Sequence, residues 1–109
     1  MIPCIEGRFE DLPFAAVAAR LGSILPAAWS FMLAARARGL GSSFTTLHLQ
    51  YEHEAAAILG VPGGVSQCAL LPVGYLLGGT LRPALRLPLR EVAFLDNWGQ
   101  PFLIAPPST

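Results

Sequence analysis

The first five residues constrain the fold more than any other segment. Met1 to Ile5 form a short, mostly apolar run that is closed by Glu6-Gly7-Arg8, a pattern typical of a buried strand that leads into a loop. A buried strand needs a neighbour on each side, and no residue precedes this one. We therefore expect an interior strand, as though the chain starts in the middle of a fold.

Charged side chains are too few to cover a small domain. They make up 13% of the 109 residues, against 53% hydrophobic, whereas about 25% charged is typical. This length allows one domain at most. We expect the chain to bury surface against another chain, or to be a fragment whose missing half covers that surface. A net charge of zero argues against nucleic-acid binding through a basic field.

The cysteines and the apolar runs bear on where in the cell the protein is expected to reside. Cys4 and Cys68 stand singly in apolar surroundings, which favours two reduced core thiols, with a disulfide or a reactive thiol as alternatives. The beginning lacks the pattern of a signal peptide. The uncharged run 55–81 contains six glycines and two prolines, which argues against a transmembrane helix. We expect a cytoplasmic protein without membrane contact.

One long helix dominates the predicted elements. Residues 15–21 suggest a short helical turn ended by Gly22, and residues 23–39 a buried helix, apolar nearly all round. Ser23 is a good N-cap, and Pro26 suits a first turn. Gly39 supplies the stop, with Arg36 and Arg38 favourable in the last turn.

The other elements are shorter. Residues 42–46 are β-prone, residues 50–59 form a helix ended by a glycine, and residues 65–73 form a nearly all-apolar strand buried on both faces. A loop over 75–88 and a helical turn over 89–94 follow. From Trp98 the chain is expected to be extended, with a flexible tail at 105–109.

Side chains offer little chemistry by spacing alone. His48 and His53 have no acidic or cysteine partner at a metal-like spacing, and Glu52 and Glu54 are interpreted as a solvated face. We therefore predict no catalytic side chain and no metal site. Glycines follow three apolar elements, at Glu6-Gly7, Gly39-Leu40-Gly41 and Gly78-Gly79, where a ligand can approach the main chain closely, although ordinary turns use glycine too.

Three segments in order resemble the C-terminal half of the flavin-dependent nitroreductase family. Pro3-Cys4-Ile5-Glu6-Gly7-Arg8 resembles its strand-end motif. Residues 23–29, continuing through 35–42, resemble its central helix and Gly-Leu-Gly turn. Leu71-Pro72-Val73-Gly74-Tyr75, then residues 86–89 and 96–98, resemble its last core strand, basic loop and tail. A Trp-Ser-Phe-Met-Leu helix and a later Leu-His-Leu are similar to an actinobacterial branch.

The resemblance implies an α+β fold (an α/β sandwich) over residues 1–104, a central sheet packed with helices that lacks its N-terminal half. It implies flavin mononucleotide (FMN) at a homodimer interface, with NAD(P)H as the electron donor and nitro compounds or quinones as acceptors. The strand-end main chain would face the redox edge of the flavin, the Gly-Leu-Gly turn would pack near the ring, and a late basic residue would contact the phosphate. By position, these cofactor-binding residues are Ile5, Glu6, Gly7, Leu40, Gly41 and Arg86. A guanidinium suits a phosphate, and a directed N–H can tune a flavin.

The sequence also departs from the family pattern. The family's Arg-Arg-Ser-type segment is absent, and a second basic position near the phosphate is Ala84 here, so that contact is missing unless Arg82 substitutes. Three alternatives stay open. The chain is a truncated nitroreductase-like enzyme, weak or inactive alone. It is a non-enzymatic remnant that associates with itself or with a full-length relative. Or its start is misassigned and the missing half is encoded upstream.

Overall fold

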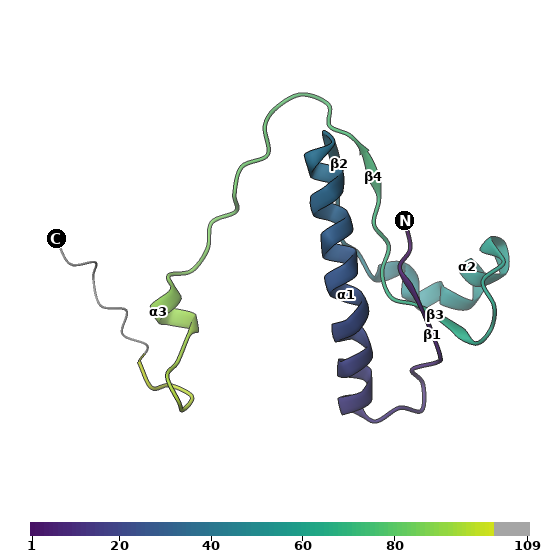
Figure 1. The fold of residues 1–109 in the computed structure, drawn as a ribbon, viewed down its shortest axis with the longest axis horizontal. Coiled ribbons are helices and arrows are strands. Elements are labelled where there is room, and N and C mark those ends of the chain that lie inside the picture. The colour runs from purple at the N-terminus through teal and green to yellow at the C-terminus, as the bar shows by residue number, and fades with distance from the viewer. Residues whose placement is uncertain (102–109) are drawn as a thin grey trace. The chain divides into compact units, whose positions relative to one another are not determined.

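The computed structural model describes residues 1–101 and divides the chain into two compact units, Met1–Gly78 and a second that begins at Gly79. Figure 1 shows the first unit as one long helix beside short strands, with a small helical segment between strands β2 (Leu40–Ser42) and β3 (Val65–Gln67). The predicted boundary at residue 104 and the predicted flexible tail at 105–109 lie outside the described residues.

Helix α1, Phe14–Ala37, is one continuous element. The predicted break at Gly22 is wrong, and Ser23 is not an N-cap, because both lie inside this helix; Pro13 stands at its N-cap. Pro26 is also interior, where its missing N–H leaves the carbonyl of Gly22 without a helical partner. Flanking alanines and leucines favour helix strongly enough to carry it across this point.

The C-terminal end of α1 confirms the prediction. Arg36 is basic in the last turn, Arg38 stands at the C-cap, and Gly39 follows with φ +80°. The N–H of Gly39 donates to the carbonyl of Arg36 at 3.1 Å. Glycine is favoured here because the left-handed conformation closes a helix without a Cβ clash.

Most of the apolar surface of α1 is not buried within this chain. Only Ala28 and Ala35 are buried in the helix, while Phe14 and Trp29 are 85% and 59% exposed. The prediction of a buried helix is therefore wrong for the chain by itself. By length and composition α1 could cross a membrane, a test that a signal sequence or the core helix of a soluble protein also passes.

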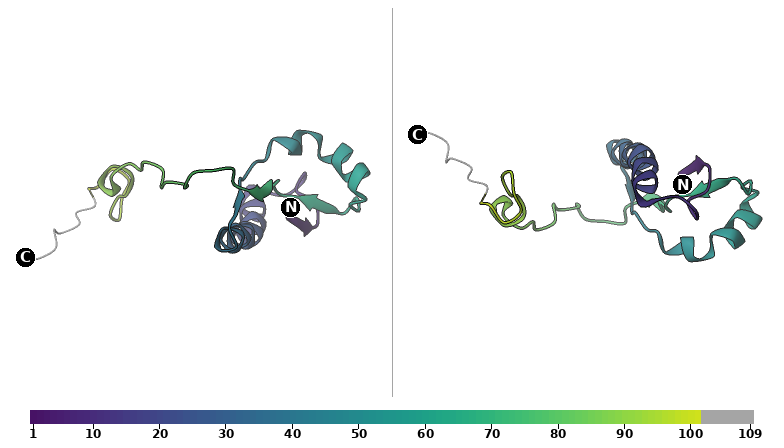
Figure 2. Two further views of the ribbon diagram at one scale, coloured as in Figure 1. Left: turned by 90° about the horizontal axis from the view of Figure 1, so that it is seen from above. Right: turned by 90° about the horizontal axis from the view of Figure 1, so that it is seen from below.

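Two antiparallel strand pairs lie beside α1 (Figures 1 and 2). Strand β1, Cys4–Glu6, pairs with β3, Val65–Gln67, in the register Cys4↔Gln67. Strand β2, Leu40–Ser42, pairs with β4, Val73–Tyr75. A mixed architecture of helices and small antiparallel sheets is an α+β class.

The predicted strand 65–73 is extended in the structure, but a bulge divides it. The N–H of Cys68 donates to the carbonyl of Pro3, at 2.9 Å, and the N–H of Leu71 donates to that of Met1, at 2.8 Å. Between these bonds one residue, Ile2, opposes two, Ala69 and Leu70, which is the signature of a β-bulge. The bulge separates β3 from β4, and the segment turns from one partner strand to the other.

The predicted opening strand needs correction. It spans Cys4–Glu6 rather than Met1–Ile5, and both Cys4 and Glu6 are exposed. Among residues 1–101, β1 has one neighbour, β3, instead of the expected two. Its other edge is open.

The small core lies where α1 meets the bulged segment. It consists of Ala28, Ala69 and Leu71, with Phe31 and Met32 packed against it. Both cysteines are free thiols. Burial raises the pKa of both thiols. Cys68 is buried as predicted, whereas Cys4 is exposed, so only one of the two is a core thiol.

The remaining helices agree with the sequence in outline. The 3-10 helix η1, Leu47–Tyr51, leads into α2, Glu52–Leu59, which ends at Gly60 with φ +72°. The β-prone segment 42–46 lies against the bulged strand, because Thr45 bonds to Leu70 through both main-chain groups, at 3.0 and 2.7 Å. In the second unit, α3 spans Leu89–Val92, two residues shorter than predicted.

Candidate functional site: the open edge of strand β1 and the glycine turn after it

The open edge of β1 presents the main-chain N–H of Glu6. Gly7 donates its N–H to the carbonyl of Gly64, at 2.7 Å, and Cys68 donates to the carbonyl of Pro3. Hydrogen-bonded and non-bonded pairs alternate along an antiparallel ladder, so the Glu6↔Val65 pair between them is a non-bonded pair. The N–H of Glu6 therefore points away from β3, into the open edge.

The outer edge of β3 supports this alternation. The N–H of Gln67 points away from β1 and donates to Glu52 Oε2 at 2.8 Å. The carbonyl of Val65 faces the same way and accepts from Arg8 at 2.8 Å. Residues 65 and 67 thus turn their polar groups outward on one side of the pair, as residues 4 and 6 do on the other.

Gly7 forms a turn that no other residue fits easily. Its φ is +99°, and a Cβ built there would lie 2.2 Å from a terminal nitrogen of Arg20. Its carbonyl accepts a hydrogen bond from Ser66 Oγ at 2.6 Å. The turn is therefore held from β3 and approached closely by α1.

Arg8 ties this turn to two other parts of the chain. Its guanidinium donates to Val65, to the carboxylate of Glu10 and, at 2.5 Å, to Glu52 Oε1. The bonds to Glu10 and Glu52 raise the pKa of Arg8 above its ordinary value. A guanidinium that donates hydrogen bonds to two carboxylates and a carbonyl at once is held in one orientation.

Glu10 is predicted to titrate unusually low. The hydrogen bonds from Arg8, helped by its own main-chain N–H, lower the pKa of Glu10 from 4.5 to about 2. Because the folded-state pKa is depressed, this interaction stabilises the fold above pH 4.5 and is lost as the pH falls through about 2. Carboxyl NMR titration should give that midpoint, and Arg8→Gln should return it toward 4.5; a wild-type midpoint near 4.5 would contradict the contact.

Glu52 is the polar residue that sequence reasoning missed. It was interpreted as part of a solvated face, but its side chain is only 14% exposed and binds both Arg8 and the main chain of Gln67. Gln67 completes the link by donating its side-chain amide to the carbonyl of Glu52 at 3.1 Å. The partners are 44 and 15 residues away in the chain, so no local pattern could reveal them.

His48 packs against the same strand. Its Nε2 lies 3.0 Å from Gln67 Oε1. Since the amide nitrogen of Gln67 already donates to Glu52, Oε1 is the acceptor and His48 Nε2 carries the proton. This agrees with the interpretation of His48 as a packing histidine.

Glu10, Glu52 and His53 come within metal-ligating distance of one another, their ligand atoms all lying within 4.8 Å. The spacing of the histidines in the sequence does not reveal this group, because the fold brings Glu10 to α2, where His53 lies. Both carboxylates, however, bind the guanidinium of Arg8. The donor set is that of an ion-paired cluster around an arginine.

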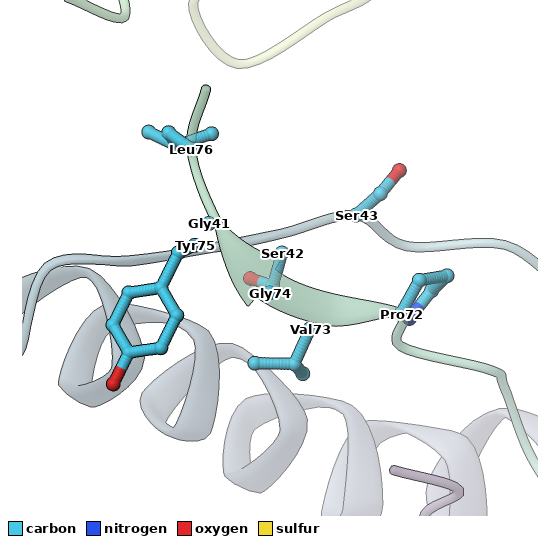
Figure 3. Close-up of a pocket in the computed structure, with 8 residues that line it drawn as sticks. All are labelled: Gly41, Ser42, Ser43, Pro72, Val73, Gly74, Tyr75 and Leu76. Atoms are coloured by element: carbon cyan, nitrogen blue, oxygen red, sulfur yellow. The ribbon is translucent and has the colours of Figure 1, made fainter. Parts of the chain in front are cut away.

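Leu40 and Gly41 lie on β2, in the other strand pair. Gly41 is buried opposite Gly74, and a Cβ there would lie 2.6 Å from the side chain of Leu76. A shallow, open depression surrounds this contact, and Figure 3 shows its lining side chains pointing in different directions. The depression is lined by Gly41, Ser42, Ser43, Pro72, Val73, Gly74, Tyr75 and Leu76.

The predicted cofactor residues thus fall into three groups. One lies at the end of β1, a second on β2, and the two are connected through the bulged segment. Arg86 is an exposed residue of the second unit, which is described by itself. The phosphate contact assigned to Arg86 stays a prediction. The first group is Ile5, Glu6 and Gly7, and the second is Leu40 and Gly41.

A family model, described as the nitroreductase family, matches residues 14–75, more than half of the chain. The matched residues include helices α1 and α2 and strands β2, β3 and β4. These elements form the core and the outer side of the candidate site. The chain belongs to the nitroreductase family.

Proposed function

We propose that this chain supplies the flavin-facing backbone of an FMN-dependent, nitroreductase-like oxidoreductase. Membership of the family supports an oxidoreductase of this kind. The observation that carries the finer proposal is the open edge of β1, where the N–H of Glu6 is directed outward beside the Gly7 turn.

The geometry limits which main-chain groups can serve. The N–H of Gly7 is already bonded to Gly64, so it is not free for a ligand. The N–H of Glu6, on the open edge directly before the Gly7 turn, is available to bind an electron-rich flavin atom. A fixed N–H directed at a nitrogen that gains charge stabilises the reduced state without any side chain. Bound FMN would supply hydride and electron transfer between NAD(P)H and a nitro compound or quinone.

The first unit offers fewer contacts to the phosphate of FMN than to its ring. Arg8 is committed to two carboxylates, and Arg20 lies against Gly7 and Arg8. The guanidinium of Arg8 is therefore not free to bind a phosphate. We assign that role to Arg86 from its position in the family resemblance, and we expect the chain alone to hold FMN weakly.

Association is part of the proposal. The exposed apolar side chains of α1, including Phe14, Trp29 and Leu33, need cover in water. A homodimer covers them and completes a site from two copies. A second candidate function, a module that pairs with a full-length relative and has no activity of its own, is favoured by the same exposed face.

One experiment separates these functions. The purified chain is mixed with FMN and passed over a sizing column that records mass and the absorbance of flavin. We expect a dimer that carries flavin, at sub-stoichiometric amounts because the phosphate contacts are few. A colourless dimer favours an association module, and a colourless monomer contradicts the flavin-binding homodimer; repeating the run with a full-length relative added tests the pairing module, which a chain that still elutes as a monomer would contradict. Riboflavin, which lacks the phosphate, is the matched ligand control.

A further inference from the structure

Glu52 links three separate segments at the candidate site. Its carboxylate divides its two oxygens, Oε1 accepting from Arg8 and Oε2 from the main chain of Gln67. We propose that Glu52 is a positioning residue, which acts through Arg8 to hold the turn at Gly7 and, with it, the Gly7–Gly64 bond that ends the ladder and keeps the Glu6 N–H on the open edge. Its relevance to flavin rests on the proposed function.

The turn needs such an anchor because glycine supplies no stiffness. Gly7 has φ +99°, a conformation with wide freedom on either side. The residues before it are fixed by the ladder with β3. Arg8, directly after it, is fixed by its side chain, which reaches across to Val65 at 2.8 Å and to Glu52 at 2.5 Å. Anchors on both sides of the glycine restrict the orientation of the peptides around it.

Glu52 is a better anchor than Glu10, although Arg8 binds both. Glu10 lies two residues from Arg8 and its side chain is 53% exposed, so this pair is local and screened by water. Glu52 is 14% exposed and belongs to α2, which is held to β3 through Gln67. Of the two carboxylates, only Glu52 therefore ties the turn to a separate element of the fold.

The test uses the chain without cofactor and follows amide hydrogen exchange by NMR. In Glu52→Gln, the Gly7 amide, which is bonded to Gly64, is expected to exchange about tenfold faster or more, because a charge-assisted bond to Arg8 is lost. The Leu70 amide, bonded to Thr45 in an isolated antiparallel bridge, serves as the internal reference and should keep its rate. Glu54→Gln makes the same charge change on an exposed side chain of α2 and should leave both rates unchanged.

A double variant asks whether Glu52 acts through Arg8. Arg8→Gln alone and together with Glu52→Gln should give the same Gly7 rate. Additive effects, or a Glu52→Gln variant in which only the Gln67 amide exchanges faster, would overturn the proposal, because Glu52 would then merely cap the edge of β3.

Flavin adds a readout that a purely structural role would not move. In Glu52→Gln the midpoint potential of bound FMN should shift to more negative values, because a poorly directed N–H stabilises the reduced ring less, and Glu54→Gln should cause no shift. An unshifted potential beside faster Gly7 exchange would overturn the link between the turn and the flavin. Absence of FMN binding in every variant would count against the proposed function, while Gly7 exchange would still decide the role of Glu52.

Discussion

Replacing Gly7 with alanine is expected to destabilise the chain by about 1–3 kcal/mol, the usual cost of forcing a side-chain-bearing residue into a sparsely populated backbone region. Gly7 has φ +99°, and the new Cβ would also displace the guanidinium of Arg20 from its place 2.2 Å away. The arginine end is flexible, so the backbone accounts for most of the cost.

Urea unfolding followed by circular dichroism measures this effect. Gly22→Ala is the matched control, because Gly22 lies inside α1 with no atom within 4 Å of an added Cβ. That variant should be more stable than wild type by about 0.5–1 kcal/mol, since alanine favours helix over glycine. Equal effects of the two changes would contradict the conformation assigned to Gly7.

Replacing Leu71 with alanine is expected to cost about 2–5 kcal/mol, the range for truncating a fully buried leucine. Leu71 is 0% exposed and is the largest fully buried side chain among the described residues. It is surrounded by Ala28, Ala69 and the partly buried Phe31 and Met32. Such a loss is a large part of the total stability of a small domain, which is about 5–15 kcal/mol, so the variant should unfold at a clearly lower urea concentration than wild type.

Leu77→Ala controls for the change in residue type. Leu77 is fully exposed, and truncating it should alter the unfolding free energy by no more than about 0.5 kcal/mol. Comparable losses in the two variants, measured by urea unfolding, would contradict the position of the core between α1 and the bulged segment.

Local chemistry predicted the ends of the helices better than their beginnings. Gly39 and Gly60 stop α1 and α2 as expected, because each takes a left-handed conformation that favours glycine. The start of α1 was misplaced because Gly22, Ser23 and Pro26 together are typical of a helix boundary. Neighbouring residues of high helix propensity override that signal.

The strands could be predicted only in part, since register is a property of pairs. The apolar run from Val65 indicates extended chain, but the bulge depends on how Cys68 and Leu71 meet Met1 and Pro3. The bulge has no signature in the run itself.

The backbone part of the candidate site could be predicted from the sequence, whereas its side-chain contacts could not. Glycine marks the turn at Gly7 in the sequence, and its positive φ follows from the absence of a Cβ. The cluster of Arg8, Glu10 and Glu52 joins residues as far as 44 positions apart. Only the folded chain brings these residues together.

The central claim is that the open edge of β1 presents the Glu6 N–H to a flavin. The most direct test is a titration of the nitrogen-15-labelled chain with oxidised FMN, followed residue by residue in amide spectra. The Glu6 amide is predicted to shift most, and the Gly7 amide, already bonded to Gly64, to shift less. A Glu6 amide that stays in place at saturating FMN would contradict the claim.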